Sequence, residues 1–318
     1  MNNEVETADK IKQGYDLLCH EIGKVVIGQK KVIKSILTAI FSNGHVLLVG
    51  VPGLAKTLLV NTIAKSLSLS FKRIQFTPDL MPSDILGAET IDKERNFKFL
   101  KGPVFANIVL ADEINRTPPK TQSSLLEAMQ ERSVTVAGNT YRLAPPFIVL
   151  ATQNPIEQEG TYPLPEAQLD RFTMMINLDY PKFEDEIEII KKTTSDQNLK
   201  VNPFLDSDQI IHYQNLILKV PVTDNVFEYT VNMVHKSRPG TSKGCEISNK
   251  YLDWGAGPRA GQFLIMAAKC NAILSGKYSP DIEDIQEVAP EILRHRLVRN
   301  FKAEADGVTI DEIIKQLF

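Results

Sequence analysis

The sequence predicts an α/β fold for residues 1–180 and a small all-α domain for residues 181–318. Apolar runs that end in polar residues alternate with helical patterns in the first part, as in α/β domains. One of those runs leads through a glycine-containing loop directly into a helix. After Asp179-Tyr180-Pro181 the long patterns all have helical periodicity, so we place the boundary there.

Composition narrows the class of protein. Of 318 residues, 43% are hydrophobic and 24% charged, values typical of a globular protein, and the net charge of −3 disfavours a protein built to coat nucleic acid. No apolar run approaches the roughly 20 residues of a membrane span, and the start, Met1–Glu6, is too polar for a secretory signal. The three cysteines lack metal-type spacing and fit reduced thiols. We therefore expect a cytoplasmic protein without membrane insertion.

Two helices precede the glycine-containing loop. The first spans Lys10 to Gly23 and the second ends near Phe41. Between them lies Val25-Val26-Ile27-Gly28-Gln29, an apolar β-branched run that ends in glycine. Such a run either wraps an adenine base or simply packs, so Ile27 and Gly28 are candidate contacts to a base.

The loop itself follows the phosphate-binding pattern G-x-x-x-x-G-K-[ST], with an alanine in place of the last glycine. The strand Val46–Val49 precedes it and a helix from Leu58 to Leu67 follows, which is the context that the motif requires. Its N–H groups and the helix N-terminus would bind phosphate oxygens, Lys56 would reach the β- and γ-phosphates, and the Thr57 hydroxyl would coordinate Mg²⁺. The methyl group of Ala55 predicts a loop that avoids positive φ there. The expected nucleotide contacts are Gly50, Pro52, Gly53, Leu54, Ala55, Lys56, Thr57 and Leu58.

Two hairpins are predicted from alternating patterns. Gly87–Ile91 and Phe97–Phe99 flank the charged segment Asp92–Asn96, which predicts a projecting hairpin with a charged tip. Ser133–Val136 and Thr140–Leu143 flank a Gly-Asn turn and predict the second hairpin.

A second strong motif ends the apolar strand Asn107–Glu113. Asp112 would hold Mg²⁺ through water, and Glu113 would orient and deprotonate an attacking water. A solvated acidic turn is the simpler interpretation of this pair alone, but its position after a phosphate-binding loop favours catalysis. Between this strand and the second hairpin, Thr117-Pro118-Pro119 predicts an N-cap and the start of a helix that runs to about Arg132.

Two later residues extend the candidate site. Asn154 follows the strand Phe147–Ala151, where its amide would help position the water if this strand lies beside the strand before the loop; otherwise it belongs to an Asn-Pro turn. Arg171 precedes the strand Met174–Leu178. It either forms a salt bridge with Asp170 or another carboxylate, or acts as an arginine finger on an adjacent subunit.

The second part contains five predicted helices, with a connection rich in glycine and serine, Arg238–Gly257, between the third and fourth. Arg259 lies near the N-terminus of the fourth helix, where a positive charge is unfavourable without a nearby anion. This favours a phosphate-sensing arginine over an ordinary surface arginine. The predicted helices are Lys182–Thr193, Asp206–Leu218, Thr223–Lys236, Arg259–Leu274 and Ser279–Ile292, the last with a cap at Ser279-Pro280-Asp281.

These motifs together resemble the AAA+ ATPases and, more closely, the MoxR family. The matching blocks are Gly50–Thr57, Leu110–Arg116, Ala151–Pro155 and Leu164–Phe172. The resemblance implies a P-loop NTPase core with a parallel five-stranded sheet, followed by a helical lid. It gives Asn154 the sensor-1 role, Arg171 the arginine-finger role and Arg259 the sensor-2 role, on its own nucleotide or on a neighbour's. Ala55 is usual in this family, whereas Gly257 stands where the family usually has serine.

The resemblance also implies a function. Family members are chaperone-like motors that depend on ATP and Mg²⁺ and work as hexamers. They act with proteins that carry a von Willebrand factor A domain and mature protein clients, in some cases by metal insertion. They are related to the magnesium chelatase motors. A nucleic-acid motor is one alternative, which the charge-balanced tip Asp92–Arg95 disfavours. A nucleotide-gated scaffold with little turnover is another, which intact Glu113 and Arg171 disfavour. A GTPase is disfavoured because Leu252 stands where the guanine-reading motif needs aspartate.

Overall fold

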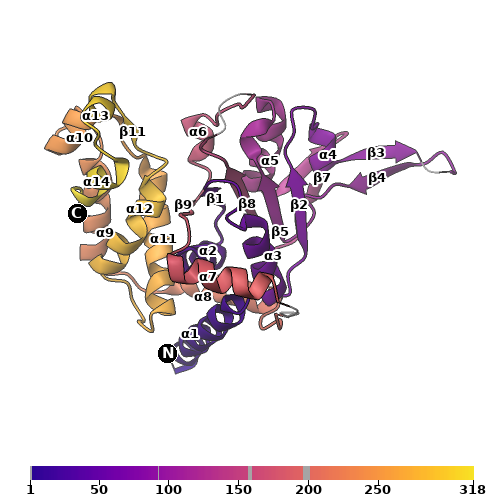
Figure 1. Ribbon diagram of the computed structural model, residues 1–318, viewed down its shortest axis with the longest axis horizontal. Coiled ribbons are helices and arrows are strands. Elements are labelled where there is room, and N and C mark those ends of the chain that lie inside the picture. The colour runs from indigo at the N-terminus through magenta and orange to yellow at the C-terminus, as the bar shows by residue number, and fades with distance from the viewer. Residues whose placement is uncertain (1, 92, 157–159, 196–200) are drawn as a thin grey trace.

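The computed structural model describes residues 2–91, 93–156, 160–195 and 201–318. A five-stranded sheet with helices around it lies beside a helical lid (Figure 1). The strand order is β2-β5-β8-β1-β9, and neighbouring strands are parallel throughout. The predicted α/β fold with a five-stranded parallel sheet is thereby confirmed. The strands are β1 Val46–Val49, β2 Phe71–Gln75, β5 Ile108–Asp112, β8 Ile148–Gln153 and β9 Met174–Asn177.

The sheet brings the sequence motifs together at one edge. Its central strands are almost wholly buried, as expected for parallel strands covered by helices on both faces. Strand β1 lies between β8 and β9, and β8 lies next to β5. Because the carboxyl ends of parallel strands meet at the same edge, the segments after β1, β5 and β8 meet there.

Helices surround this sheet and form the lid. Helix α1 Asn2–Gly23 begins earlier than predicted, and the long lid helices lie within three residues of their predicted bounds. The remaining core helices are α2 Lys30–Phe41, α3 Lys56–Ser66, α4 Pro82–Leu86, α5 Pro119–Glu131 and α6 Glu166–Leu169, with a 3₁₀ turn at Ile114–Arg116. After the sheet follow α7 Phe183–Thr193, α8 Ser207–Lys219, α9 Asp224–Lys236, α10 Glu246–Tyr251, α11 Pro258–Leu274, α12 Ile282–Leu293, α13 Phe301–Ala305 and α14 Ile310–Lys315.

Two predicted helix caps are wrong. The N-cap of α5 is Pro118, because the Thr117 hydroxyl instead donates to the Thr77 carbonyl at 3.0 Å. The N-cap of α12 is Asp281, whose carboxylate accepts from the Asp284 N–H at 3.1 Å, while the Ser279 hydroxyl donates to Pro221. In both cases the hydroxyl that the local sequence predicts as a cap instead donates a hydrogen bond to a carbonyl far away in the sequence.

Both predicted hairpins are present. Strands β3 Gly87–Ile91 and β4 Phe97–Lys101 pair antiparallel and project from the core (Figure 1). Asp92, part of the predicted tip, lies outside the described residues. The second hairpin comprises β6 Ser133–Val136 and β7 Asn139–Arg142. Phe99 stacks on Tyr141 with ring centroids 4.2 Å apart, which ties the two hairpins together.

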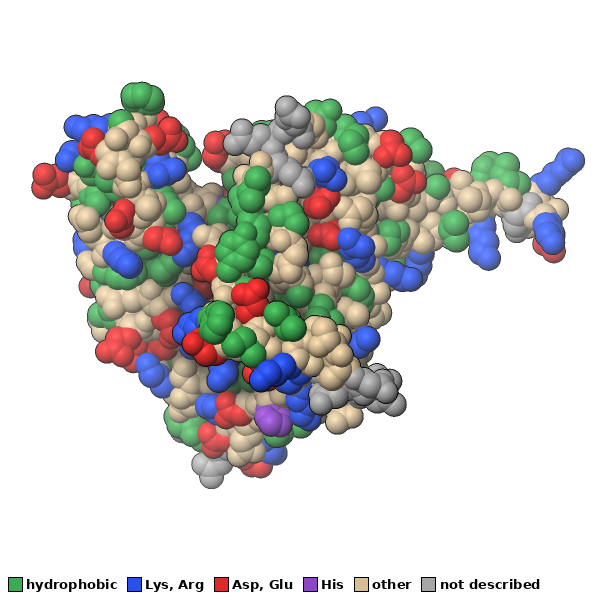
Figure 2. Space-filling model, viewed as in Figure 1, with side chains coloured by type: hydrophobic (Ala, Val, Ile, Leu, Met, Phe, Trp, Pro, Cys, Tyr) green, Lys and Arg blue, Asp and Glu red, His purple; other side chains and the backbone are tan. Residues whose placement is uncertain are grey.

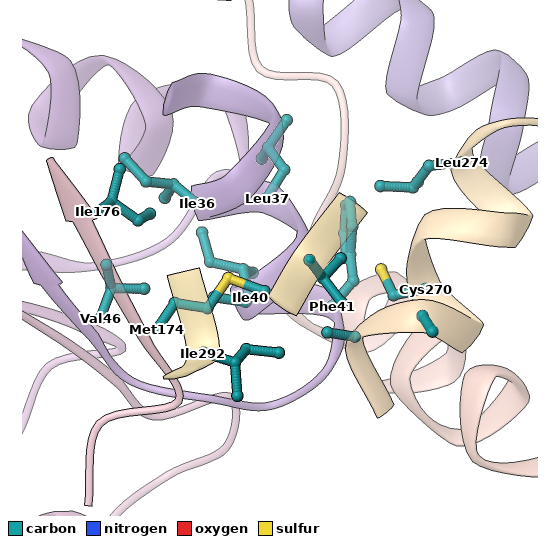
Figure 3. Packing of buried hydrophobic residues seen from close by; sticks show 14 of the residues in the cluster. Ile36, Leu37, Ile40, Phe41, Val46, Met174, Ile176, Cys270, Leu274 and Ile292 are labelled. Carbon is teal, nitrogen blue, oxygen red and sulfur yellow. The ribbon is translucent and has the colours of Figure 1, made fainter. Parts of the chain in front are cut away.

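The lid and the core share one hydrophobic interior. Figure 3 shows α2 side chains, among them Ile40 and Phe41, between β9 residues and lid residues such as Cys270 and Ile292. The connection between α9 and α11 contains α10 and a short strand, β10 Leu252–Trp254, which pairs with β11 Val298–Arg299. Among the described residues, no helix is long and apolar enough to cross a bilayer.

Candidate nucleotide-binding site

The loop after β1 forms a phosphate-binding cradle. Gly53 has φ of +88°, a conformation that suits glycine, and α3 begins at Lys56 without a side-chain cap. The uncapped N–H groups of the first turn are available to bind an anion. The Lys56 ammonium donates to the Gly50 carbonyl at 2.5 Å, so it lies over the loop in which phosphates would sit.

The conformation of Ala55 corrects one prediction. Its φ is +54°, in the left-handed region, whereas we predicted that the methyl group would exclude a positive φ. The methyl group makes this conformation costly, by about 1–2 kcal/mol, without forbidding it. The surrounding loop and helix hold the strained residue, as is common at ligand-binding sites.

The two acidic residues after β5 are held by a hydrogen-bond network from three adjacent strands. Asp112 accepts from the Thr152 hydroxyl at 2.6 Å through one oxygen and from Arg73 at 2.6 and 3.0 Å through the other. Glu113 accepts from Gln75 at 2.9 Å, and its N–H donates to the Thr152 hydroxyl at 2.8 Å. Both carboxylates are thus oriented before any ligand is bound.

Sequence reasoning missed three members of this network. Arg73 and Gln75 alternate along β2 and Thr152 lies near the end of β8, yet only the strand order places them beside β5. Polar residues at alternate positions of a strand were the available signal, because such side chains share one face.

The predicted water-positioning residue lies at the same edge. Asn154 directly follows Gln153, which pairs with Val49 at the end of β1, so Asn154 is a neighbour of the phosphate-binding loop. It is buried, and its side-chain oxygen accepts from the Ile156 N–H at 3.2 Å. The condition set for its predicted role, a strand beside β1, is met.

The loop before α2 borders a cavity next to this edge. Gly28 has φ of +76° and, with Tyr180 and Pro181, lines a cavity of about 330 Å³. A side chain at Gly28 would collide with the Asp185 carboxylate. Gln29 donates to the Leu54 carbonyl at 3.4 Å, which connects this loop to the phosphate cradle. The cavity therefore lies where the base of a nucleotide in the cradle would be expected.

Arg171 and Arg259 lie at the opposite edge of the sheet. Together with Arg132 they line a cavity of about 190 Å³ that includes Asn43–His45, the residues just before β1. The four residues of β1 span about 13 Å and separate this cavity from the phosphate cradle. The structure thus brings the two predicted arginines together but not with the cradle of the same chain.

The salt-bridge alternative for Arg171 is not observed with Asp170. That carboxylate accepts instead from Arg259 at 3.2 Å and from Arg296 at 2.7 Å. Within the described ranges, no carboxylate lies within salt-bridge distance of Arg171.

The residues present fit Mg²⁺ and ATP. The described part of the chain has no cluster of three histidine, cysteine or acidic side chains that would hold a metal alone. Magnesium instead prefers one or two protein oxygens together with phosphates and water, which Thr57 and Asp112 would provide.

A P-loop and paired carboxylates at one edge of this five-stranded sheet, with a helical lid, define the class: an AAA+ ATPase. The family model described as "ATPase family associated with various cellular activities" matches residues 45–174, and that of the AAA lid domain matches residues 246–317. A crystal structure of a candidate ATPase from Cytophaga hutchinsonii is 45% identical, with a TM-score of 0.92 and coverage of 98% of this chain and 95% of that one.

Curated relatives narrow the class further. Chaperone MoxR1 of Mycobacterium tuberculosis is 42% identical over 300 residues, covering 93% of this chain and 79% of that protein. The uncharacterised protein YeaC of Bacillus subtilis is also 42% identical, with coverage of 93% and 90%. Protein MoxR of Methylorubrum extorquens is 32% identical, with coverage of 87% and 85%. The chain belongs to the MoxR family of AAA+ ATPases.

Proposed function

We propose that this protein hydrolyses Mg-ATP at sites shared between neighbouring subunits of a ring, and uses the energy to remodel protein clients. The observation that carries the proposal is the separation of the site into two halves. The phosphate cradle and both carboxylates lie at one edge of the sheet, and the arginine pair lies at the other. The cradle half lacks the two arginines, and the arginine half lacks the phosphate cradle, so a neighbouring subunit would supply the missing half.

At the cradle edge, the chain's own residues would bind the nucleotide and arrange the water. Lys56 would move from the Gly50 carbonyl to the phosphates, while Thr57 and Asp112 would hold Mg²⁺, which neutralises phosphate charge. Glu113 would accept a proton from the attacking water, which Asn154 would help position. Because Gln75 and Thr152 orient Glu113 in advance, little reorganisation is needed when ATP binds.

At the other edge, Arg171 and Arg259 would act in trans on the nucleotide of the next subunit. Arg171 has no carboxylate partner among the described residues, so its guanidinium is available to an incoming phosphate, and bidentate arginine contacts suit the transition-state charge. Arg259 is held near Arg171 by Asp170, so both guanidinium groups would reach the neighbour's nucleotide together. The position of Arg259 beside Arg171 supports the alternative in which it acts on the neighbouring subunit's nucleotide.

The name of one relative supports a proposal for the client process. Because MoxR1 is named a chaperone, we propose a chaperone-like motor that acts in the cytoplasm as a homo-hexamer. A protein with a von Willebrand factor A domain would be its partner, and a folded or maturing protein its client.

The test measures ATP turnover per subunit against protein concentration, with mass followed by light scattering. Wild type should gain turnover steeply as rings form. Glu113→Gln and Arg171→Ala should bind a fluorescent ATP analogue normally yet lose turnover by about 100-fold or more. Arg299→Ala, which removes an exposed arginine on the lid strand β11, is the matched control and should remain active.

Three results would contradict the proposal. Full activity of Arg171→Ala, or equal turnover by monomers and rings, would rule out a shared site. Tight ATP binding by wild type without turnover at any concentration would favour a nucleotide-gated scaffold.

A further inference from the structure

Helix α7 carries three of its four apolar side chains on the solvent side, whereas Ile189 is half-buried on the opposite face. Phe183, Ile187 and Ile190 follow the spacing i, i+4, i+7 and therefore share one face of the helix. Phe183 is 75% exposed and Ile190 56% exposed, and α7 contains no buried residue. Figure 2 shows hydrophobic side chains gathered over α7 at the centre of this face. We name Phe183, Ile187 and Ile190 the α7 stripe.

The opposite, largely polar face of α7 is the one that contacts the protein. Asp185 lies against Gly28, and the Lys192 ammonium reaches the Lys24 carbonyl at 3.4 Å. A surface helix of a globular protein normally has the reverse orientation, with its apolar stripe toward the core. An exposed apolar stripe of this kind marks an interaction site.

The lid contains a groove that suits such a helix. It lies between α9 and α11, has a volume of about 490 Å³ and is lined by apolar side chains, including Val231, which is 50% exposed. Among the residues that the structure describes, no carboxylate lines it, whereas the Arg238 guanidinium does. Its other apolar lining residues include Phe227, Val234, Ile265 and Met266.

We propose that the α7 stripe of one subunit docks in this lid groove of the adjacent subunit. The charges are complementary, because the first turn of α7 carries the exposed carboxylates of Glu184 and Glu186, and the groove carries Arg238. The apolar stripe also matches the apolar lining of the groove, and an amphipathic helix in an apolar groove is a recurrent mode of recognition.

Position supports the same partner. Helix α7 directly follows Tyr180 and Pro181, which line the cavity beside the phosphate cradle. The groove includes Pro258, the residue before Arg259 at the arginine edge. A contact that joins the cradle side of one copy to the arginine side of the next would therefore bring α7 toward the groove. This inference rests on the proposed ring and names the surfaces that hold it together.

The test uses Ile190→Asp in the stripe and Val231→Asp in the groove. Both side chains are at least half exposed, so the full-length variants should fold and bind a fluorescent ATP analogue. Each variant should raise the concentration for half-maximal assembly in Mg-ATP, followed by light scattering, by about tenfold or more. Leu218→Asp on α8, 58% exposed and outside both surfaces, is the matched control and should assemble like wild type.

A mixing experiment separates this contact from a general loss of assembly. Ile190→Asp keeps an intact groove, and Val231→Asp keeps an intact stripe. In an equimolar mixture, the intact stripe of Val231→Asp can dock in the intact groove of Ile190→Asp, but the other two surfaces of the pair are both disrupted. Because the interface is head-to-tail, the mixture should form a species of twice the monomer mass but no closed ring.

The outcomes distinguish the docking from the proposed function. If both variants assemble like wild type, or if Leu218→Asp dissociates as they do, the docking is wrong while the shared catalytic site stands. If the stripe instead binds a client or partner protein, both variants assemble normally, which also overturns the docking. If wild type hydrolyses ATP but never assembles, the ring itself is refuted.

Discussion

Replacement of Asp170 by asparagine tests how the lid is fixed to the core at the arginine edge. The Arg296 side chain is only 2% exposed, and its guanidinium donates to the Asp170 carboxylate at 2.7 Å. Burial lowers the pKa of Arg296 to about 10, and the Asp170 carboxylate limits that fall. Asp170→Asn keeps the size of the side chain but removes the negative charge that faces a buried cation.

The expected cost is about 3 kcal/mol in the free energy of unfolding. Removal of one partner of a buried ion pair typically costs about 3–5 kcal/mol. The lower end applies because Arg296 still donates to the carbonyls of Asp170 and Phe172, at 3.1 and 2.6 Å. The second contact of Asp170, with the partly exposed Arg259, adds at most about 1 kcal/mol.

Urea denaturation at neutral pH measures this difference. Arg259→Gln is the matched control, since it breaks only the exposed contact of Asp170 and should cost less than about 1 kcal/mol. If Asp170→Asn and Arg259→Gln destabilise the protein equally, or if Asp170→Asn is neutral, Asp170 is not the counter-charge that stabilises buried Arg296.

Three further predictions concern the site and the sheet. Arg73→Gln frees one oxygen of Asp112, the carboxylate that we propose holds Mg²⁺, and should lower the Mg²⁺ concentration needed for half-maximal binding of a fluorescent ATP analogue, whereas Lys72→Gln on the same strand should not. Burial lowers the pKa of His45 from 6.5 to about 4. The contribution of the neutral imidazole to the free energy of unfolding is therefore complete above pH 6.5 and is lost as the pH falls toward 4. At about 1.36 kcal/mol per pKa unit this is about 3 kcal/mol, and a His45→Gln variant should lack that part of the pH dependence in urea titrations. Ala55→Gly should change the unfolding free energy by less than about 1 kcal/mol, because relief of backbone strain opposes the greater entropy of the unfolded chain; a larger destabilisation would contradict the observed left-handed conformation.

Local sequence determined much of this protein. The phosphate-binding loop, the carboxylate pair and most helices follow from residue spacing, because hydrophobic periodicity and turn chemistry act over a few residues. The predicted strands and hairpins were found within a few residues of their expected bounds. Where local reasoning failed, as at Thr117 and Ala55, contacts with distant or surrounding residues outweighed a weak local preference.

Tertiary structure alone decided how these pieces act together. The strand order places Arg73, Gln75 and Thr152 around Asp112 and Glu113, although they come from three separate segments of the chain. Packing of α11 against the core carries Arg259 to the edge opposite its own phosphate cradle, which no spacing in the sequence reveals. Periodicity shows that α7 has an apolar stripe but not which way it faces, because the direction of a helix face depends on what packs beside it.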